Sequence, residues 1–311
     1  MLEILWRTFS STPAHHNATP AQHNTSSSTG NDSHDRAPLV FFHVPKAGTS
    51  FTSALLEYGC RYNGSAGLLH LLNDARTGRL DPVKARCAPD AFESQLGVSH
   101  PPLTTDQAHR AHVVGMFRAP IDRVASGLAH NFHDCEAVPR HLNVSCSATH
   151  NDYGCAAKVA DLEQATLMYA DCVTGCVTRM LTGTPCGRNS IKAPAAASRN
   201  SLAISRLQTA FKFMGDTGMW NRSVCIFCGL FAPRLQAYDY DLLFENVRPS
   251  KAEDTVEKAK TILRAHKWYD VADEAVYNEV RGWLDRVEPK LQKNERYKAC
   301  RAEWVMRRRK R

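Results

Sequence analysis

A lysine, a glycine and two hydroxyl residues lie together in Pro45-Lys46-Ala47-Gly48-Thr49-Ser50, directly after an apolar run. Glycine lets backbone N–H groups approach an anion closely, lysine supplies positive charge, and the first amides of a helix attract phosphate. We therefore expect a phosphate-binding loop formed by Lys46, Ala47, Gly48, Thr49 and Ser50. The lysine precedes the glycine, so this is not a Walker A loop. Alone, the segment would equally fit an ordinary strand-to-helix turn with a hydroxyl cap.

A second group of polar residues lies in Arg118-Ala-Pro-Ile-Asp-Arg-Val-Ala-Ser126, again after an apolar run. An arginine at the end of a strand and a serine eight residues later can both reach one further phosphate. We expect Arg118 and Ser126 to do so. Asp122 and Arg123, between them, are expected to form a surface ion pair.

The elements that must position these residues follow from the apolar pattern. Residues 39–44 and 111–117 read as buried parallel strands, each followed by a loop and a helix. Two such units predict an α/β fold with a parallel sheet flanked by helices. The remaining predictions are an irregular insert, a further strand and six helical segments: insert 138–154, strand 211–215, helices 50–58 and 121–131 after the two loops, helical patterns over 156–181 and 197–210, and helices 252–267 and 272–298.

The chain of 311 residues divides into three parts. Residues 1–38 are predicted to be a stem, because 11–38 lack large apolar side chains to bury. Residues 39–298 form one predicted domain, and 299–311 a basic, solvated and frayed tail. Of the net charge of +8, the last five residues supply 5, which leaves 8 − 5 = +3 for the rest. We therefore expect no nucleic-acid partner.

Eleven scattered cysteines predict disulfides and a secretory compartment. The close pair Cys225 and Cys228 has no second pair or nearby histidine, so zinc is not expected there. Asn-x-Ser/Thr sequons point the same way; they are at Asn17, Asn24, Asn31, Asn63, Asn143 and Asn221. No apolar stretch is long enough to span a membrane, so we expect membrane association only through a missing N-terminal anchor.

The two motifs resemble those of a known enzyme family. The segment Phe41 to Phe51 resembles the 5′-phosphosulfate loop of sulfotransferases that use 3′-phosphoadenosine 5′-phosphosulfate (PAPS), and Arg118 to Ser126 resembles their 3′-phosphate motif. The order and separation of the motifs are similar to those of Golgi carbohydrate sulfotransferases. Two later segments, Leu207 to Phe231 and Tyr269 to Tyr277, are also similar to that group.

The resemblance implies a single P-loop-like sulfotransferase domain in the Golgi lumen or secreted. It implies PAPS as co-substrate, no metal, and transfer of the sulfuryl group to a glycan hydroxyl, and it leaves the oligomeric state open. Lys46, Gly48, Thr49 and Ser50 would bind the 5′-phosphosulfate, with Lys46 catalytic, and Arg118 and Ser126 would bind the 3′-phosphate.

The acceptor hydroxyl needs a base, and histidine suits this role with a pKa of about 6.5. His100 lies before Arg118 and resembles the base position of uronosyl-type members. Glu93, His43 and His112 remain alternatives. Trp220 and Trp283 are expected to pack in the core instead of stacking on a sugar.

Two other functions remain open at this point. One is nucleotide-dependent phosphoryl transfer, which the missing Walker A loop and the lack of a visible Mg²⁺ partner make weaker. The other is a catalytically inactive, secreted glycoprotein that binds glycans. The presence of Lys46, Arg118 and Ser126 counts against the second alternative.

Overall fold

The computed structural model describes residues 39–48, 100–144, 146, 155–187, 199–231 and 252–310. The stem, the predicted helix 50–58, and Thr49, Ser50 and Glu93 lie outside the described residues.

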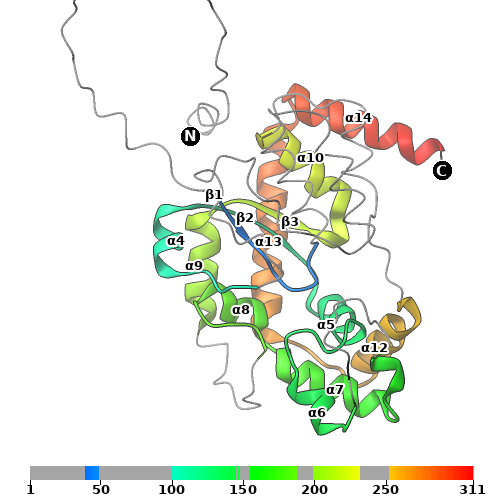
Figure 1. Cartoon of the computed structure of the whole chain (residues 1–311). Coiled ribbons are helices and arrows are strands. Elements are labelled where there is room, and N and C mark those ends of the chain that lie inside the picture. The colour runs from blue at the N-terminus through cyan, green and yellow to red at the C-terminus, as the bar shows by residue number, and fades with distance from the viewer. Residues whose placement is uncertain are drawn as a thin grey trace, which may run out of the picture.

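Three parallel strands form the central sheet in the order β1-β2-β3 (Figure 1). They are β1 (Leu39–Phe42), β2 (His112–Phe117) and β3 (Phe211–Asp216). The strand predictions are confirmed to within two residues, and β1 ends early because the chain enters a turn at Val44. Nearly every side chain described in these strands is buried, as expected for a parallel sheet covered on both faces. The α/β class is therefore confirmed.

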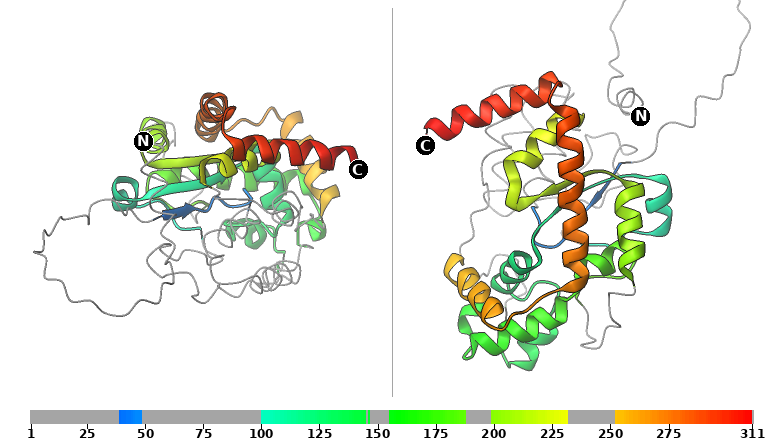
Figure 2. Two further views of the ribbon diagram at one scale, coloured as in Figure 1. Left: turned by 90° about the horizontal axis from the view of Figure 1, so that it is seen from above. Right: turned by 180° about the vertical axis from the view of Figure 1, so that it is seen from behind.

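Helices follow β2 and β3 and cover the sheet. α5 (Pro120–Ala129) follows β2, and α10 (Trp220–Phe231) follows β3 after a short 3₁₀ turn, η5 (Thr217–Met219). The long helix α13 (Val271–Leu291) crosses one face of the sheet (Figure 2). On its buried side α13 presents Val276, Val280 and Leu284, with Trp283 and Val287 partly buried beside them.

One predicted helical segment and the predicted irregular insert differ in detail from the structure. The pattern over 156–181 is broken into η3 (Ala156–Lys158), α7 (Leu162–Val173) and α8 (Cys176–Leu181). The break between α7 and α8 occurs at Gly175, whose φ of 68° is incompatible with a continuous right-handed helix. The predicted irregular insert begins with a short helix, α6 (Ala137–His141). Further helices among the described residues are α4 (Thr105–Arg110), α9 (Asn200–Ala210) and α12 (Glu253–Ala265).

The C-terminal region corrects two predictions. The predicted helix 272–298 is two helices, because α14 (Glu295–Lys310) begins anew after Asn294. The side chain of Asn294 accepts hydrogen bonds from the N–H groups of Arg296 (2.9 Å) and Tyr297 (3.3 Å), which caps α14. The proposed boundary between 298 and 299 therefore falls inside α14. The basic tail is helical to residue 310 instead of frayed, because buried Tyr297 and Cys300 anchor it.

Four disulfides are present among the described residues, which confirms the disulfide prediction. They are Cys135–Cys172, Cys146–Cys155, Cys176–Cys186 and Cys225–Cys300. Cys225 is therefore not available to a metal pair with Cys228, whose thiol is buried. This density of disulfides is typical of proteins from oxidising compartments. Within the described part of the chain, no helix has the length and apolar character needed to cross a bilayer.

Candidate functional site

A tight turn follows β1 and carries the predicted catalytic lysine. The Ala47 N–H donates to the carbonyl of Val44 (3.2 Å), with Pro45 and Lys46 at the two central positions. Lys46 has a φ of 60°, so the turn has the type II pattern, in which glycine is usual at this position. A non-glycine residue in the left-handed region costs about 1–2 kcal/mol. Such strain is common where a loop holds a functional side chain in place.

Gly48 fits this loop against the ends of the other two strands. Its φ is 87°, and a Cβ added there would lie 3.2 Å from the Thr217 methyl group and 3.3 Å from both Met116 and Trp220. A side chain at position 48 would therefore be both strained and crowded. The loop after β1 thus packs directly on the carboxyl ends of β2 and β3.

Arg118 joins the second motif to the first. It directly follows β2, and its Nη1 donates to the carbonyl of Lys46 (3.3 Å). Burial lowers the pKa of Arg118, and the nearby Asp122 carboxylate opposes that change. Two segments 72 positions apart therefore meet at the carboxyl edge of the sheet. Ser126 lies half-buried in the second turn of α5.

The expected surface pair between Asp122 and Arg123 is wrong. Arg123 is buried, and its Nη2 donates to Asp273 (3.1 Å) at the start of α13. Asp122 instead pairs with Lys260 of α12 (2.9 Å). Neighbours on a helix point in different directions, so one side chain faces the core and the other faces α12. The motif helix α5 is thereby fixed to two C-terminal helices.

His100 is held by hydrogen bonds of the segment that precedes α4. The buried Arg206 of α9 donates to the carbonyl groups of Leu103 (3.1 Å) and Leu181 (2.7 Å), which ties this segment to α8. The His100 ring centroid lies 4.4 Å from that of His43, which follows β1. Since His43 stands three residues before Lys46, the structure brings His100 to the lysine loop.

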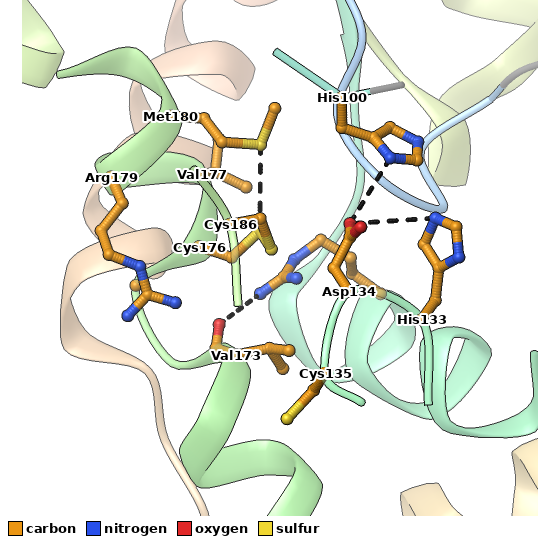
Figure 3. The surroundings of a disulfide bond; sticks show 12 residues. His100, His133, Asp134, Cys135, Val173, Cys176, Val177, Arg179, Met180 and Cys186 are labelled. Carbon is orange, nitrogen blue, oxygen red and sulfur yellow. Dashed lines mark hydrogen bonds and ion pairs between the residues drawn. A yellow bond between two sulfur atoms is a disulfide. The ribbon is translucent and has the colours of Figure 1, made fainter. Parts of the chain in front are cut away.

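A carboxylate that the sequence reasoning missed faces two histidines (Figure 3). Asp134 Oδ2 lies 3.5 Å from His100 Nδ1 and 3.8 Å from His133 Nε2. The His100 and His133 rings are 4.8 Å apart at their centroids. The available signal was the cluster His130-Asn-Phe-His133-Asp134 directly after the motif helix, two histidines and a carboxylate within five residues.

His133 and Asp134 differ in their charge at ordinary pH. Burial lowers the pKa of His133 to about 3; His100, Lys46 and His130 contribute to the lowering, and Asp134 opposes it. His133 is therefore neutral at ordinary pH. Burial alone would raise the pKa of Asp134, but His100, His133 and Arg123 outweigh burial and hold that pKa below its usual value. Asp134 is thus an ionised carboxylate.

The alternative bases His112 and His43 lie at different edges of the sheet. His112 pairs with Leu39 in the register of the sheet, so it lies at the amino edge, away from Lys46. His43 lies on the same side as His100 and is 7% exposed.

His100, His133 and Asp134 also have the ligand types that a metal requires. Their ligand atoms all lie within 4.8 Å of one another. Two imidazoles and a carboxylate form a known set for zinc or iron. The same arrangement suits a direct carboxylate–imidazole pair, and the two alternatives differ in their response to chelators.

The end of β3 adds further polar groups beside the loop. Asp216 accepts a hydrogen bond from the Tyr277 hydroxyl (2.8 Å), and burial followed by this bond raises the pKa of Tyr277. Within the described ranges, the buried Thr217 hydroxyl has no hydrogen-bond partner. Trp220 and Trp283 are both partly buried against the core, as predicted.

No protein-family model matches the chain, and no curated protein and no solved structure shows significant similarity to it. Functional inference therefore depends on the motif residues and on the geometry that brings them together.

Proposed function

We propose that the protein is a PAPS-dependent sulfotransferase that modifies a hydroxyl group of a glycan. The observation that carries this proposal is the contact of Arg118 with the carbonyl of Lys46, which unites the two motifs. Ligands of α/β proteins bind at the carboxyl edge of the parallel strands, where both motifs lie. The α/β sheet then serves as the P-loop-like core of a single sulfotransferase domain.

Each motif has a defined role in this proposal. The Lys46 ammonium and the loop amides through Gly48 hold the 5′-phosphosulfate, with help from Thr49 and Ser50. Arg118 and Ser126 hold the 3′-phosphate.

The reaction is an in-line displacement at sulfur. The acceptor oxygen forms a new bond to sulfur while the bond between sulfur and the 5′-phosphate oxygen breaks. The products are a sulfate ester and 3′-phosphoadenosine 5′-phosphate (PAP). Negative charge grows on the departing phosphate oxygen, where a lysine ammonium stabilises the transition state.

His100 takes the proton of the acceptor hydroxyl. Its position beside His43 and the lysine loop supports this role. His133 is a poorer base because its low pKa makes it weakly basic. His100 later releases the proton to solvent, so the step needs no further reactant.

The proposed compartment is the Golgi lumen or the extracellular space. Four disulfides among the described residues support an oxidising environment.

Nucleotide binding tests the two motifs directly. Calorimetry should show PAP binding more tightly than ADP by about ten- to a hundredfold per lost contact, since ADP lacks the 3′-phosphate. Arg118→Gln should reduce this preference, whereas Arg110→Gln, at an exposed position of α4, should leave it unchanged. Equal affinities of the wild type for PAP and ADP would contradict the role of the second motif.

Transfer is tested with radiolabelled PAPS and a panel of galactosides, glucosaminoglycans, chondroitin and tyrosyl peptides. We expect label in at least one glycan. Label from γ-labelled ATP in the same panel would favour the phosphotransferase alternative. Tight PAP and glycan binding without transfer from either donor would favour the inactive glycan-binding protein.

A further inference from the structure

We infer that Asp134 is a positioning residue for His100: its carboxylate holds the Nδ1–H tautomer, which leaves Nε2 as the proton acceptor of the site. The inference rests on the proposed function for its catalytic meaning, and on geometry alone for the pairing itself. It adds to the site a residue that no sequence motif contains.

The pairing is visible in the relative position of the two side chains (Figure 3). The His100 side chain is 9% exposed, and its Nδ1 lies 3.5 Å from Asp134 Oδ2. Within the described residues, Oδ2 is buried and accepts no hydrogen bond of standard geometry. A buried, ionised oxygen without a donor is costly, so a small closing movement toward the Nδ1–H is favoured. Catalytic hydrogen bonds are often long before substrate binds.

The turn that carries Asp134 is built to hold an unusual backbone. Asn131, Phe132 and Asp134 all have positive φ, between 56° and 62°. Three left-handed non-glycine residues within four positions cost several times the roughly 1–2 kcal/mol of one. The surroundings must therefore impose this conformation, which is common at functional sites.

Hydrogen bonds supply part of this constraint. The Tyr169 hydroxyl of α7 donates to the carbonyl of His133 (2.7 Å), and the His133 N–H donates to the carbonyl of Gly127 in α5 (3.0 Å). The Asn131 side chain accepts from the N–H of Cys155 (3.3 Å). The residues that precede Asp134 are thus attached to other elements.

Two disulfides complete the constraint. Cys135, next to Asp134, is bonded to Cys172 of α7. On the other side Gly187 packs so closely on the Asp134 carbonyl that a Cβ would overlap with it. Gly187 follows Cys186, which is bonded to Cys176 of α8. The Asp134 backbone is therefore enclosed between two cross-linked segments.

Other charged and titratable groups face this pair from several elements. His43 comes from the end of β1, His133 from the same turn as Asp134, Lys46 from the lysine loop and Arg123 from α5. Positive charge from Arg123 favours an ionised Asp134 carboxylate, and Lys46 contributes to keeping His133 neutral. His133 stays neutral, so it does not compete with His100 as the cation that Asp134 stabilises.

The chemical consequence follows from the shape of imidazole. Its two nitrogens point to opposite sides of the ring, so a carboxylate at Nδ1 directs Nε2 away from Asp134. When Nε2 takes the acceptor proton, the new positive charge lies beside the carboxylate. The same division of roles operates in the Ser-His-Asp arrangement of hydrolases.

The decisive measurement is the tautomer of His100, read by NMR of protein labelled with ¹⁵N in its histidine rings. The wild type should show His100 with its proton on Nδ1, and Asp134→Asn should move that population toward Nε2–H. Glu163→Gln is the matched control, because Glu163, in the first turn of α7, pairs with the exposed His266 (2.7 Å). It should change the His266 signal and leave His100 unchanged.

Kinetics then connect the tautomer to the reaction. Asp134→Asn should lower kcat about 10²-fold, the scale expected for a misplaced catalytic group, while PAP affinity stays within twofold. Glu163→Gln should retain wild-type kcat. An equal loss of PAP affinity and kcat would indicate a merely structural role and overturn the inference.

The remaining outcomes also test the inference about Asp134. If Asp134→Asn does not fold, the wild-type spectrum suffices, since His100 in the Nε2–H tautomer overturns the inference. A shift of the His100 signals on treatment with EDTA would mean that the cluster binds a metal, which also overturns it. If no acceptor is ever sulfated but the tautomer depends on Asp134, the pairing stands and the proposed reaction falls.

Discussion

The two halves of the candidate site are held in place by different forces. The half that we propose to bind the anion, Lys46 to Gly48 with Arg118, is called the anion-binding half, and it is fixed by the parallel strands and by backbone geometry. The base half, His100 with Asp134, lies beyond the ends of the strands and is fixed by cross-links. Its supports are a buried arginine, Arg206, and two disulfides that flank Asp134.

This difference predicts that a change in the protein can abolish the function of one half and leave the other half intact. The loop after β1 depends on the main chain and on strand pairing, and residues 43–48 contain no cysteine. The turn around Asp134 depends on bonds that need an oxidising compartment. We therefore expect nucleotide binding to survive changes that abolish catalysis, and the predictions below test this separation.

The largest expected effects are those of substituting Lys46 and His100, which should differ in their consequences for PAP affinity. Lys46→Ala should reduce both PAP affinity and turnover, because one ammonium contacts the ground-state phosphosulfate and the charge that develops on the leaving oxygen. His100→Ala should reduce turnover by about 10² to 10⁴ and leave PAP affinity nearly unchanged. Calorimetry and single-turnover kinetics measure the two quantities. Wild-type turnover in His100→Ala would move the base to His43 or Glu93.

The second prediction compares two disulfides. Removing Cys135–Cys172 or Cys225–Cys300 by double alanine substitution should lower the free energy of unfolding by about 4 kcal/mol each, given loops of 37 and 75 residues. Only the first should also lower kcat, by about 10-fold or more, when measured well below the melting temperature. PAP affinity should persist in both. Equal kcat in the two variants would show that the base half does not depend on its cross-link.

The sequence predicts that Arg118 and the loop from Lys46 to Gly48 come together, because each segment has a local pattern. The roles of Gly48 and of an arginine after an apolar run can be recognised from a few neighbouring residues. The strands can be recognised from the apolar pattern of a single sequence. Asp134 is different. Its importance arises only when the turn after α5 meets His100, 34 positions earlier, and no local pattern encodes that meeting.

The same reasoning explains the corrected predictions. Arg123 looks like a surface residue in its helix, but α13 supplies a buried carboxylate, Asp273, 150 positions later. The C-terminal residues look like a frayed basic tail, but a disulfide from Cys300 to α10 anchors their helix. In both places a tertiary contact overrides local composition.

The third prediction uses two aspartates with opposite pKa changes. Burial, followed by Asp273, raises the pKa of Asp270 from 3.8 to about 6, whereas the pKa of Asp134 is lowered. A raised carboxyl pKa means that stability is lost as pH rises from about 4 to about 6. A lowered one means that stability present above about pH 4 is lost as pH falls through the folded-state pKa.

Calorimetry between pH 3 and 7 distinguishes the two effects, and that of Asp270 is on the order of 2–3 kcal/mol. Asp270→Asn should flatten the decline in melting temperature between pH 4 and 6. Asp134→Asn should flatten the decline below pH 4. Asp254→Asn, at an exposed position of α12, should change neither. If Asp270→Asn and Asp134→Asn flattened the same pH range, Asp134 would not be ionised as the geometry of the base half requires.

The smallest expected effect tests whether the anion-binding loop exists before nucleotide arrives. Lys46 has a φ of 60°, so Lys46→Gly should relieve backbone strain that Lys46→Ala retains. The glycine variant should be more stable than the alanine variant by about 1 kcal/mol, or roughly 2–4 °C in melting temperature. At the exposed helical position Ser205 the order should be reversed, with alanine more stable than glycine, because glycine is unfavourable within α9. If alanine were also the more stable residue at position 46, the left-handed turn would not be preformed. The loop would then have to be ordered by the bound anion, and the cross-linked base half would be the more rigid part of the site.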